Sequence, residues 1–177
     1  MKKILFAFIL VFAVLVSAAR AQTPADPENT LYMDLSYGRV VIQLRPDLAP
    51  KHVARVKELV RKGFYDGLTF HRVIEGFMAQ TGDPTGTGTG GSGQNIPAEF
   101  TAEPFVRGTV GAARAQSINS ADSQFFVTFA DSFFLNNQYT VWGKVVSGME
   151  FVDKIRRGEP PATPDKIVKM QVAADVK

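Results

Sequence analysis

The chain has 177 residues with 20 Lys+Arg, 17 Asp+Glu and no cysteine, which excludes disulfides, thiolate chemistry and cysteine-based metal sites. Three of the basic residues (Lys2, Lys3 and Arg20) and none of the acidic ones lie within residues 1–21. Residues 22–177 therefore carry 17 charges of each sign, so no positive excess indicates binding to nucleic acid or to a membrane surface.

Residues 1–21 have the three parts of a secretory signal peptide. Residues 1–3 are a short positive start, residues 4–16 are uncharged and apolar, and residues 19–21 (Ala-Arg-Ala) fit a cleavage site. The apolar run of about 13 residues is shorter than the ~20 that a membrane-spanning helix needs. We expect cleavage after Ala21, no membrane association afterwards, and export to the periplasm.

One domain is expected after the signal peptide. Residues 22–29 are polar, contain two prolines and are expected to be flexible. Residues 30–177 have the size of a single domain with one core. At its start, apolar and polar residues alternate over 31–35 and again over 40–44, which predicts a β-hairpin with one buried face.

An amphipathic helix is expected after the hairpin. Pro50 suits the first turn of a helix, apolar residues recur after it at helical spacing, and Gly63 ends the pattern. Val53 and Val56 belong to the apolar side of this helix, whereas His52 is expected on its solvated side.

Strand patterns dominate the rest of the chain, with a second short helix expected at 149–157. The predicted strands cover residues 69–74, 77–80, 110–114, 123–129, 140–146 and 167–173. Many strands and two helices indicate a mainly β fold. A closed antiparallel β-barrel with a helix at each end is the arrangement that we expect.

Arg72 is the residue that points most directly to a function. It stands in an otherwise apolar strand, where a cation needs a partner or a role. A salt-bridged surface arginine would explain it in isolation. Phe77, Met78 and Gln80 follow within eight residues, however, and together these side chains would suit a pocket for an apolar ring beside an amide.

His71 could in principle serve as a general base. Because side chains alternate along a strand, Phe70, Arg72 and Ile74 are expected on one face, and His71 and Val73 on the other. A lone histidine in a strand is more often a hydrogen-bonded structural residue. We therefore assign His71 a supporting role at the border of the site.

A second strand repeats the combination of glutamine and aromatic residue. Gln124 and Phe126 share one face of it, whereas Phe125 and Val127 are expected in the core. A glutamine amide in a protein interior needs all its donors and acceptors satisfied. Beside a cleft, Gln124 could instead bind the backbone of a substrate.

Other catalytic motifs are not indicated. The run TGTGTGGSGQ at 85–94 lacks the Gly-Lys-Ser/Thr ending of a phosphate-binding loop and is interpreted as a surface loop beside the site. The sequence has no Gly-x-Ser-x-Gly elbow and no His-Glu-x-x-His motif. We expect neither a metal nor a cofactor.

From about Leu31 onward, the chain resembles the cyclophilin-type peptidyl-prolyl isomerases. The resemblance rests on FHRVIEGFMAQTGDPTGTGTGG, SQFFVTFADSFFLNNQYTVWGKV and GMEFVDKI, in family order, and GAARAQSINSADSQFF is similar to the bacterial secreted members. It implies a closed eight-stranded antiparallel β-barrel with two capping helices. It also implies a monomer that isomerises X-Pro bonds in exported polypeptides without a cofactor, and so assists their folding.

The resemblance also implies roles for individual residues. Arg72 matches the catalytic arginine, and Gln80 and Gln124 match residues that contact the substrate backbone. Ala115 is central to the segment 114–116, which matches the strand that pairs with the bound peptide. The proline pocket is matched by Phe77, Met78, Phe126 and Leu135.

Two positions depart from the eukaryotic members of that family. Phe134 stands where they have a tryptophan that binds cyclosporin, so weak cyclosporin binding is expected. Tyr139 replaces a histidine at the pocket edge and keeps an aromatic wall. Two alternative functions remain open: a chaperone-like module that binds proline-containing segments without turnover, and a small-molecule carrier, which would need a hollow barrel.

Overall fold

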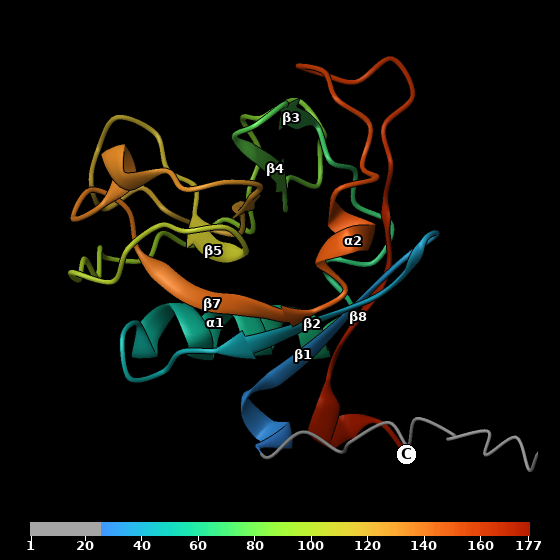
Figure 1. Cartoon of the computed structure of the whole chain (residues 1–177). Coiled ribbons are helices and arrows are strands. Elements are labelled where there is room, and N and C mark those ends of the chain that lie inside the picture. Colours follow the sequence, from blue (N-terminus) through green and yellow to red (C-terminus); the bar gives the residue numbers. More distant parts are fainter. Residues whose placement is uncertain (1–25) are drawn as a thin grey trace, which may run out of the picture.

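The computed structural model describes residues 26–177 and places eight strands in one antiparallel sheet. The strands are β1 (Thr30–Leu35), β2 (Gly38–Leu44), β3 (Arg72–Ile74), β4 (Met78–Thr81), β5 (Thr109–Ala112), β6 (Phe125–Thr128), β7 (Val141–Ser147) and β8 (Ile167–Val172). Their order is β3-β4-β6-β5-β7-β2-β1-β8, and the sheet curls around its core (Figure 1). The mainly β fold is confirmed, whereas the predicted signal peptide and residues 22–25 lie outside the described residues.

The barrel expected from the sequence is not closed by regular strand pairing. No continuous ladder joins the first and last strands of the sheet, β3 and β8. Isolated bridges, Thr69 to Lys166 and Val73 to Gly158, instead link the chain around β3 to the segment that leads into β8. That segment, 158–166, contains three prolines, which have no N–H to donate to a ladder.

The interior of the curled sheet is filled with side chains. Phe125 of β6 lies between the rings of Tyr65 and Trp142, with centroid distances of 5.5 and 5.3 Å in edge-on geometry. Leu31, Met33, Phe70, Ile42, Leu44 and Ile167 are also almost fully buried. A packed interior does not suit a small-molecule carrier, which would need a cavity there.

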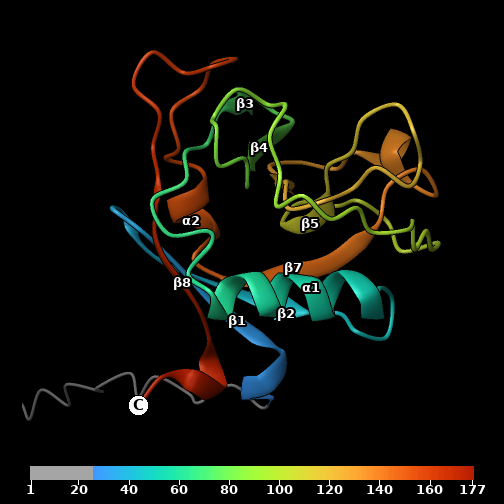
Figure 2. The same ribbon diagram turned by 180° about the vertical axis from the view of Figure 1, so that it is seen from behind.

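Helix α1 (Pro50–Arg61) packs against β7 and β8 (Figure 2), but the expected position of His52 is wrong. Only 1% of the His52 side chain is exposed, and its Nδ1 lies 2.7 Å from the Glu99 carboxylate. The same carboxylate accepts hydrogen bonds from the backbone N–H groups of Lys51 and His52. Glu99 thus caps the first turn and holds His52 against the interior. Burial lowers the pKa of His52, although Glu99 acts in the opposite direction.

Helix α2 (Met149–Val152) is shorter than the predicted helix over 149–157. Beyond it, the N–H groups of Lys154 and Ile155 donate to carbonyls three residues back, which tightens the chain into turns. The N–H of Arg156 donates to the Asp165 carboxylate at 2.8 Å. Asp165 belongs to the segment 158–166. Its contact occupies the N–H of Arg156, which a longer helix would have used for its own hydrogen bonds.

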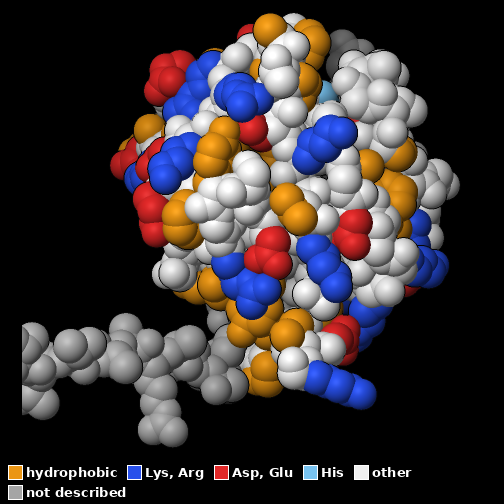
Figure 3. Space-filling model, turned by 90° about the vertical axis from the view of Figure 1, so that its right-hand side faces the viewer, with side chains coloured by type: hydrophobic (Ala, Val, Ile, Leu, Met, Phe, Trp, Pro, Cys, Tyr) orange, Lys and Arg blue, Asp and Glu red, His pale blue; other side chains and the backbone are white. Residues whose placement is uncertain are grey.

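Short 3₁₀ turns complete the described chain, at Pro27–Asn29, Phe133–Leu135 and Ala173–Asp175. No helix within residues 26–177 is long and apolar enough to cross a membrane. On the face shown in Figure 3, basic and acidic side chains are interspersed, with hydrophobic ones scattered between them. This face therefore presents no large patch of one sign of charge.

Candidate active site

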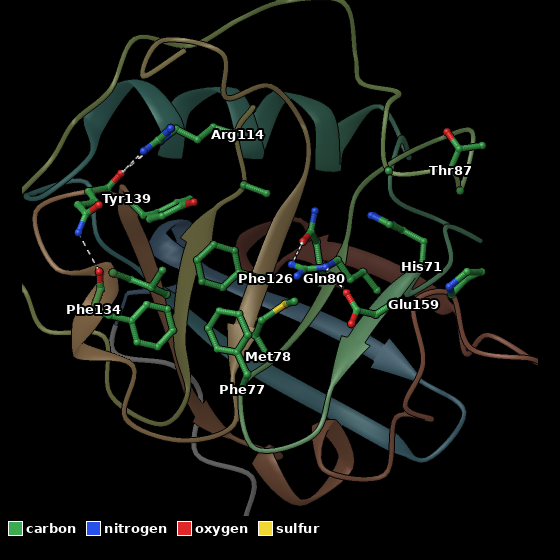
Figure 4. Close-up of a pocket in the computed structure, with 17 residues that line it drawn as sticks. His71, Phe77, Met78, Gln80, Thr87, Arg114, Phe126, Phe134, Tyr139 and Glu159 are labelled. Atoms are coloured by element: carbon green, nitrogen blue, oxygen red, sulfur yellow. Dashed lines mark hydrogen bonds and ion pairs between the residues drawn. The ribbon is translucent and has the colours of Figure 1, made fainter. Parts of the chain in front are cut away.

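A pocket of about 890 Å³ gathers most of the residues singled out from the sequence. Nine of them line it: His71, Arg72, Phe77, Met78, Gln80, Phe126, Phe134, Leu135 and Tyr139. Figure 4 shows Phe77, Met78, Phe126 and Phe134 in one part of the pocket and Gln80, His71 and Glu159 in another. The remaining two residues, Ala115 and Gln124, line a smaller adjoining pocket of about 380 Å³ together with Gln80.

The register of the sheet brings distant residues into one row. Arg72 on β3 is directly opposite Gln80 on β4, Gln80 is opposite Phe126 on β6, and Phe126 is opposite Gly111 on β5. Side chains of directly opposite residues lie on the same face of a sheet. A cation, an amide and an aromatic ring therefore stand side by side.

Gly111 leaves the space that the aromatic part of this row needs. A Cβ atom at this position would lie 2.6 Å from the Phe126 ring and 2.7 Å from the Phe105 ring. Phe105 stacks on Phe126 with ring centroids 5.7 Å apart. Sequence reasoning identified neither Gly111 nor Phe105, because their contribution depends on strand pairing.

The apolar part of the pocket is a small cluster separate from the main core. Met78, Phe105, Phe126, Leu135 and Val141 are its buried members. Tyr139 and Phe77 pack at its border, with Tyr139 edge-on to Phe126 at a centroid distance of 5.9 Å. These side chains form an apolar surface of the kind that binds an apolar ring.

Phe134 lies at the open rim of the pocket. Its ring centroid is 5.3 Å from that of Phe77, yet 64% of the residue is exposed. Leu135, the next residue, is only 6% exposed. The short turn Phe133–Leu135 thus directs one apolar side chain into the pocket wall and leaves the preceding one available to a ligand.

A chain of hydrogen bonds crosses the polar part of the site. Arg72 Nη1 lies 3.5 Å from Gln80 Oε1, and Gln80 Nε2 donates to Gln124 Oε1 at 2.9 Å. Gln124 Nε2 in turn donates to the carbonyls of Gly88 and Gly90 at 3.0 and 2.8 Å. The two glutamine amides are thus oriented before any ligand arrives.

Asp83 holds the glycine- and threonine-rich loop that carries those carbonyls. Its buried carboxylate accepts hydrogen bonds from the Thr85 hydroxyl and from backbone N–H groups of Thr85, Thr87, Gly88 and Gly90. Burial alone would raise the pKa of Asp83, but these hydrogen bonds outweigh it and lower the pKa to about 2. The predicted surface loop is therefore fixed beside the site.

His71 and Phe70 do not follow the predicted alternation. Phe70 is fully buried in the main core, whereas His71 lines the same pocket as Arg72. The reason is that β3 starts only at Arg72, so the pleat does not extend back to residues 70 and 71. Both ring nitrogens of His71 are buried without a protein partner, and burial lowers the pKa of this side chain.

The segment 114–116 lies beyond the end of β5. The Ala115 N–H donates to Ser120 Oγ at 3.0 Å, and its carbonyl accepts from Arg114 Nη1 at 3.0 Å. Arg114 also covers the ring of Tyr139, with its guanidinium carbon 4.7 Å from the centroid. A peptide that paired with Ala115 would have to share or displace these bonds.

Glu159 and Pro160 line the pocket, although no sequence motif indicated them. The Glu159 carboxylate accepts a hydrogen bond from Arg72 Nε at 2.7 Å. These two residues are 87 positions apart, and the bridge between Val73 and Gly158 brings them opposite each other. Among residues 26–177, no three His, Cys, Asp or Glu side chains gather as metal ligands would.

Comparison with known proteins accounts for this geometry. A sequence profile described as "Cyclophilin type peptidyl-prolyl cis-trans isomerase/CLD" matches residues 30–172. The chain belongs to the cyclophilin-type peptidyl-prolyl cis-trans isomerases. The family resemblance seen in the sequence is thereby confirmed, and so are the enzyme class and the activity, cis-trans isomerisation of X-Pro peptide bonds.

Relatives from bacteria and solved structures agree with this assignment. A probable peptidyl-prolyl cis-trans isomerase of Brucella suis biovar 1 (strain 1330) is 54% identical over 182 residues, covering 93% of each chain. Peptidyl-prolyl cis-trans isomerase B of Bacillus subtilis (strain 168) is 43% identical, over 68% of this chain and 85% of its own. A cyclophilin crystal structure from Hirschia baltica has a TM-score of 0.80 at 29% identity, covering 86% of this chain and 76% of that one.

A second solved structure was obtained in the presence of a dipeptide. The crystal structure of a cyclophilin-type isomerase from Cryptosporidium parvum, obtained in the presence of the dipeptide Ala-Pro, has a TM-score of 0.75 at 28% identity. The match covers 81% of this chain and 98% of that one. The family similarity thus extends over nearly all of the described fold, including the strands that carry the pocket.

Proposed function

We propose that this isomerase acts on proline-containing segments of exported polypeptides and assists their folding in the periplasm. The family assignment supports the reaction, and the signal-peptide pattern of residues 1–21 supports the location. The observation that carries the proposed site is the position of Arg72. Its guanidinium lines the pocket that the apolar side chains also line, and it reaches the first amide of the hydrogen-bonded chain.

The proposed mechanism follows from the electronic structure of the peptide bond. Resonance gives the C–N bond partial double-bond character and a rotational barrier of ~18–20 kcal/mol. In the twisted transition state, the prolyl nitrogen regains a lone pair. Arg72 would donate to that nitrogen only once resonance is lost, so the interaction favours the transition state over the ground state.

The neighbouring residues would hold the substrate during this rotation. Phe77, Met78, Phe126 and Leu135 would enclose the proline ring, while the carbonyl that precedes it turns. Gln80, Gln124 and the backbone at Ala115 would bind the substrate backbone. His71 would lie at the border of the site without a role in proton transfer, because the reaction requires no net proton transfer. Its burial disfavours the charged form, so the side chain would remain neutral.

A refolding assay tests this function and separates it from binding alone. The chain beginning at Gln22 should accelerate a refolding step that is limited by X-Pro isomerisation, which is slow without a catalyst. It should act as a monomer and without added metal or cofactor. Binding of proline-containing peptides with no acceleration would support the chaperone-like alternative instead.

A further inference from the structure

We infer that Glu159 is a positioning residue for Arg72. The inference rests on the proposed catalytic role of Arg72 and adds a residue of the segment 158–166 to the site. Arg72 Nε donates to Glu159 Oε2 at 2.7 Å on one side, and Arg72 Nη1 faces Gln80 Oε1 at 3.5 Å on the other. The guanidinium is thus held between an anion and an amide.

The backbone places Glu159 opposite Arg72. Val73 and Gly158 exchange two backbone hydrogen bonds, each 2.8 Å long, in an antiparallel bridge. The residue before Val73 therefore faces the residue after Gly158. Glu159 thereby extends the row formed by Arg72 and Gln80 beyond the edge of β3.

The turn that carries Glu159 is built tightly. Gly158 has a φ of +145°, and a Cβ atom there would lie 2.5 Å from Pro161 Cα, so only glycine fits. Pro161 is buried, whereas Pro160 beside it is exposed and lines the pocket. The carboxylate of Glu159 is therefore presented from a fixed point of the pocket wall.

The exposure of the ion pair argues against a role in folding. The side chains of Arg72 and Glu159 are 43% and 52% exposed, and ion pairs at such exposure add little to stability. Their contact does, however, restrict the orientation of a long, flexible side chain. An arginine that is already oriented loses less conformational freedom in the transition state, which favours catalysis.

The direction of the contact also suits this role. Glu159 occupies the Nε–H of Arg72, so the planar guanidinium is held by one edge. The amino group of Nη2 and one hydrogen of Nη1 are left for the substrate. Because the substrate interaction is formed in the transition state, loss of positioning should lower kcat and leave KM nearly unchanged.

The test compares three variants of the chain that begins at Gln22. Glu159→Ala removes the acceptor, and Glu159→Gln keeps an uncharged oxygen that can still accept from Nε. Glu75→Gln is the matched control, because Glu75 pairs with Arg157 Nε at 2.6 Å outside the pocket. The measurements are kcat and KM on a proline-containing peptide, and the order parameter of the Arg72 Nε–H in ¹⁵N NMR.

We expect Glu159→Ala to lower kcat three- to tenfold with KM within twofold, and to lower the Arg72 order parameter. Glu159→Gln should retain more activity than Glu159→Ala, and Glu75→Gln should match the wild type in both measurements. Unchanged or faster catalysis by a folded Glu159→Ala protein would overturn the inference. An inactive wild type would instead overturn the proposed function, so the two failures are distinguishable.

Discussion

Arg72 is the residue on which the rate should depend most. We predict that Arg72→Ala lowers kcat/KM by at least about tenfold, which corresponds to roughly 1.4 kcal/mol of transition-state stabilisation. Arg72→Lys should also be poor, because an ammonium group cannot bind Glu159 and Gln80 through the edges of a planar fork. The measurement is a peptide isomerisation assay, with circular dichroism to confirm folding.

His71 provides the comparison for this prediction. His71→Gln should cost less activity than either Arg72 variant if no proton is transferred. Burial lowers the pKa of His71, which favours the neutral side chain, so titration of His71 should not alter kcat/KM between pH 7 and 8. Near wild-type turnover by a folded Arg72→Ala protein would leave the apolar pocket as the main source of catalysis.

Phe134 determines the expected response to cyclosporin. The residue is 64% exposed at the pocket rim and has no N–H to donate. We predict weak binding by the wild type and binding about 3- to 10-fold tighter by Phe134→Trp, as one added hydrogen bond would provide. Calorimetric titration measures both affinities, and equal affinities would show that the missing donor is not the cause.

The loop held by Asp83 should make stability depend on pH. Its pKa of about 2 in the folded protein lies below the ~3.9 of an unfolded aspartate. Asp83 therefore contributes stability above about pH 4 and loses it as the pH falls through 2. The difference amounts to about 2–3 kcal/mol by proton linkage.

We predict that Asp83→Asn lowers the free energy of unfolding by about 2 kcal/mol or more at pH 7. The asparagine replaces an acceptor oxygen by a donor that faces backbone N–H groups. Urea denaturation at pH 7, 4 and 2 measures the effect, which should shrink toward pH 2. The exposed Glu150→Gln serves as a control, and an equal loss at every pH would rule out the carboxylate charge as its source.

At the scale of elements, the sequence predicts best those strands and helices whose buried face follows a local periodicity. Alternation over 31–35 and 40–44 gave the hairpin of β1 and β2, and the apolar side of α1 is buried as predicted. His52 stands four and seven residues before Val56 and Leu59 and so shares their buried face. Its polarity suggested solvent, because the sequence does not show that Glu99, 47 residues later, is its partner. The second helix was predicted too long because Asp165 takes the N–H of Arg156.

The site was predictable to the extent that it lies within family motifs. Arg72, Gln80 and Phe126 stand in such segments, and they line one pocket. Glu159 lies outside the quoted segments, and Gly111, although it begins one of them, has no side chain that would mark its role. The contact of Glu159 with Arg72 and the open space beside Gly111 both depend on which segments pair in the sheet. That pairing is not a local property of the sequence.

For the molecule as a whole, export is the property that most directly tests the reading of residues 1–21. We predict a processed N-terminus at Gln22, from the Ala-Arg-Ala sequence at 19–21. Intact-mass measurement of the protein recovered from the periplasm determines the site. A species that retains Met1 in the membrane fraction would show that the segment is an anchor.

The irregular segment 158–166 bears on the proposed action of this enzyme on unfolded chains. A strand at the edge of a sheet offers unpaired N–H and C=O groups to any extended polypeptide. Here Val73 of β3 is bonded to Gly158, and Ile167 of β8 exchanges hydrogen bonds with the backbone at 67 and 68. Both outer strands are thus shielded at these points from strand addition, which would favour binding of such chains at the proposed proline pocket over aggregation with them.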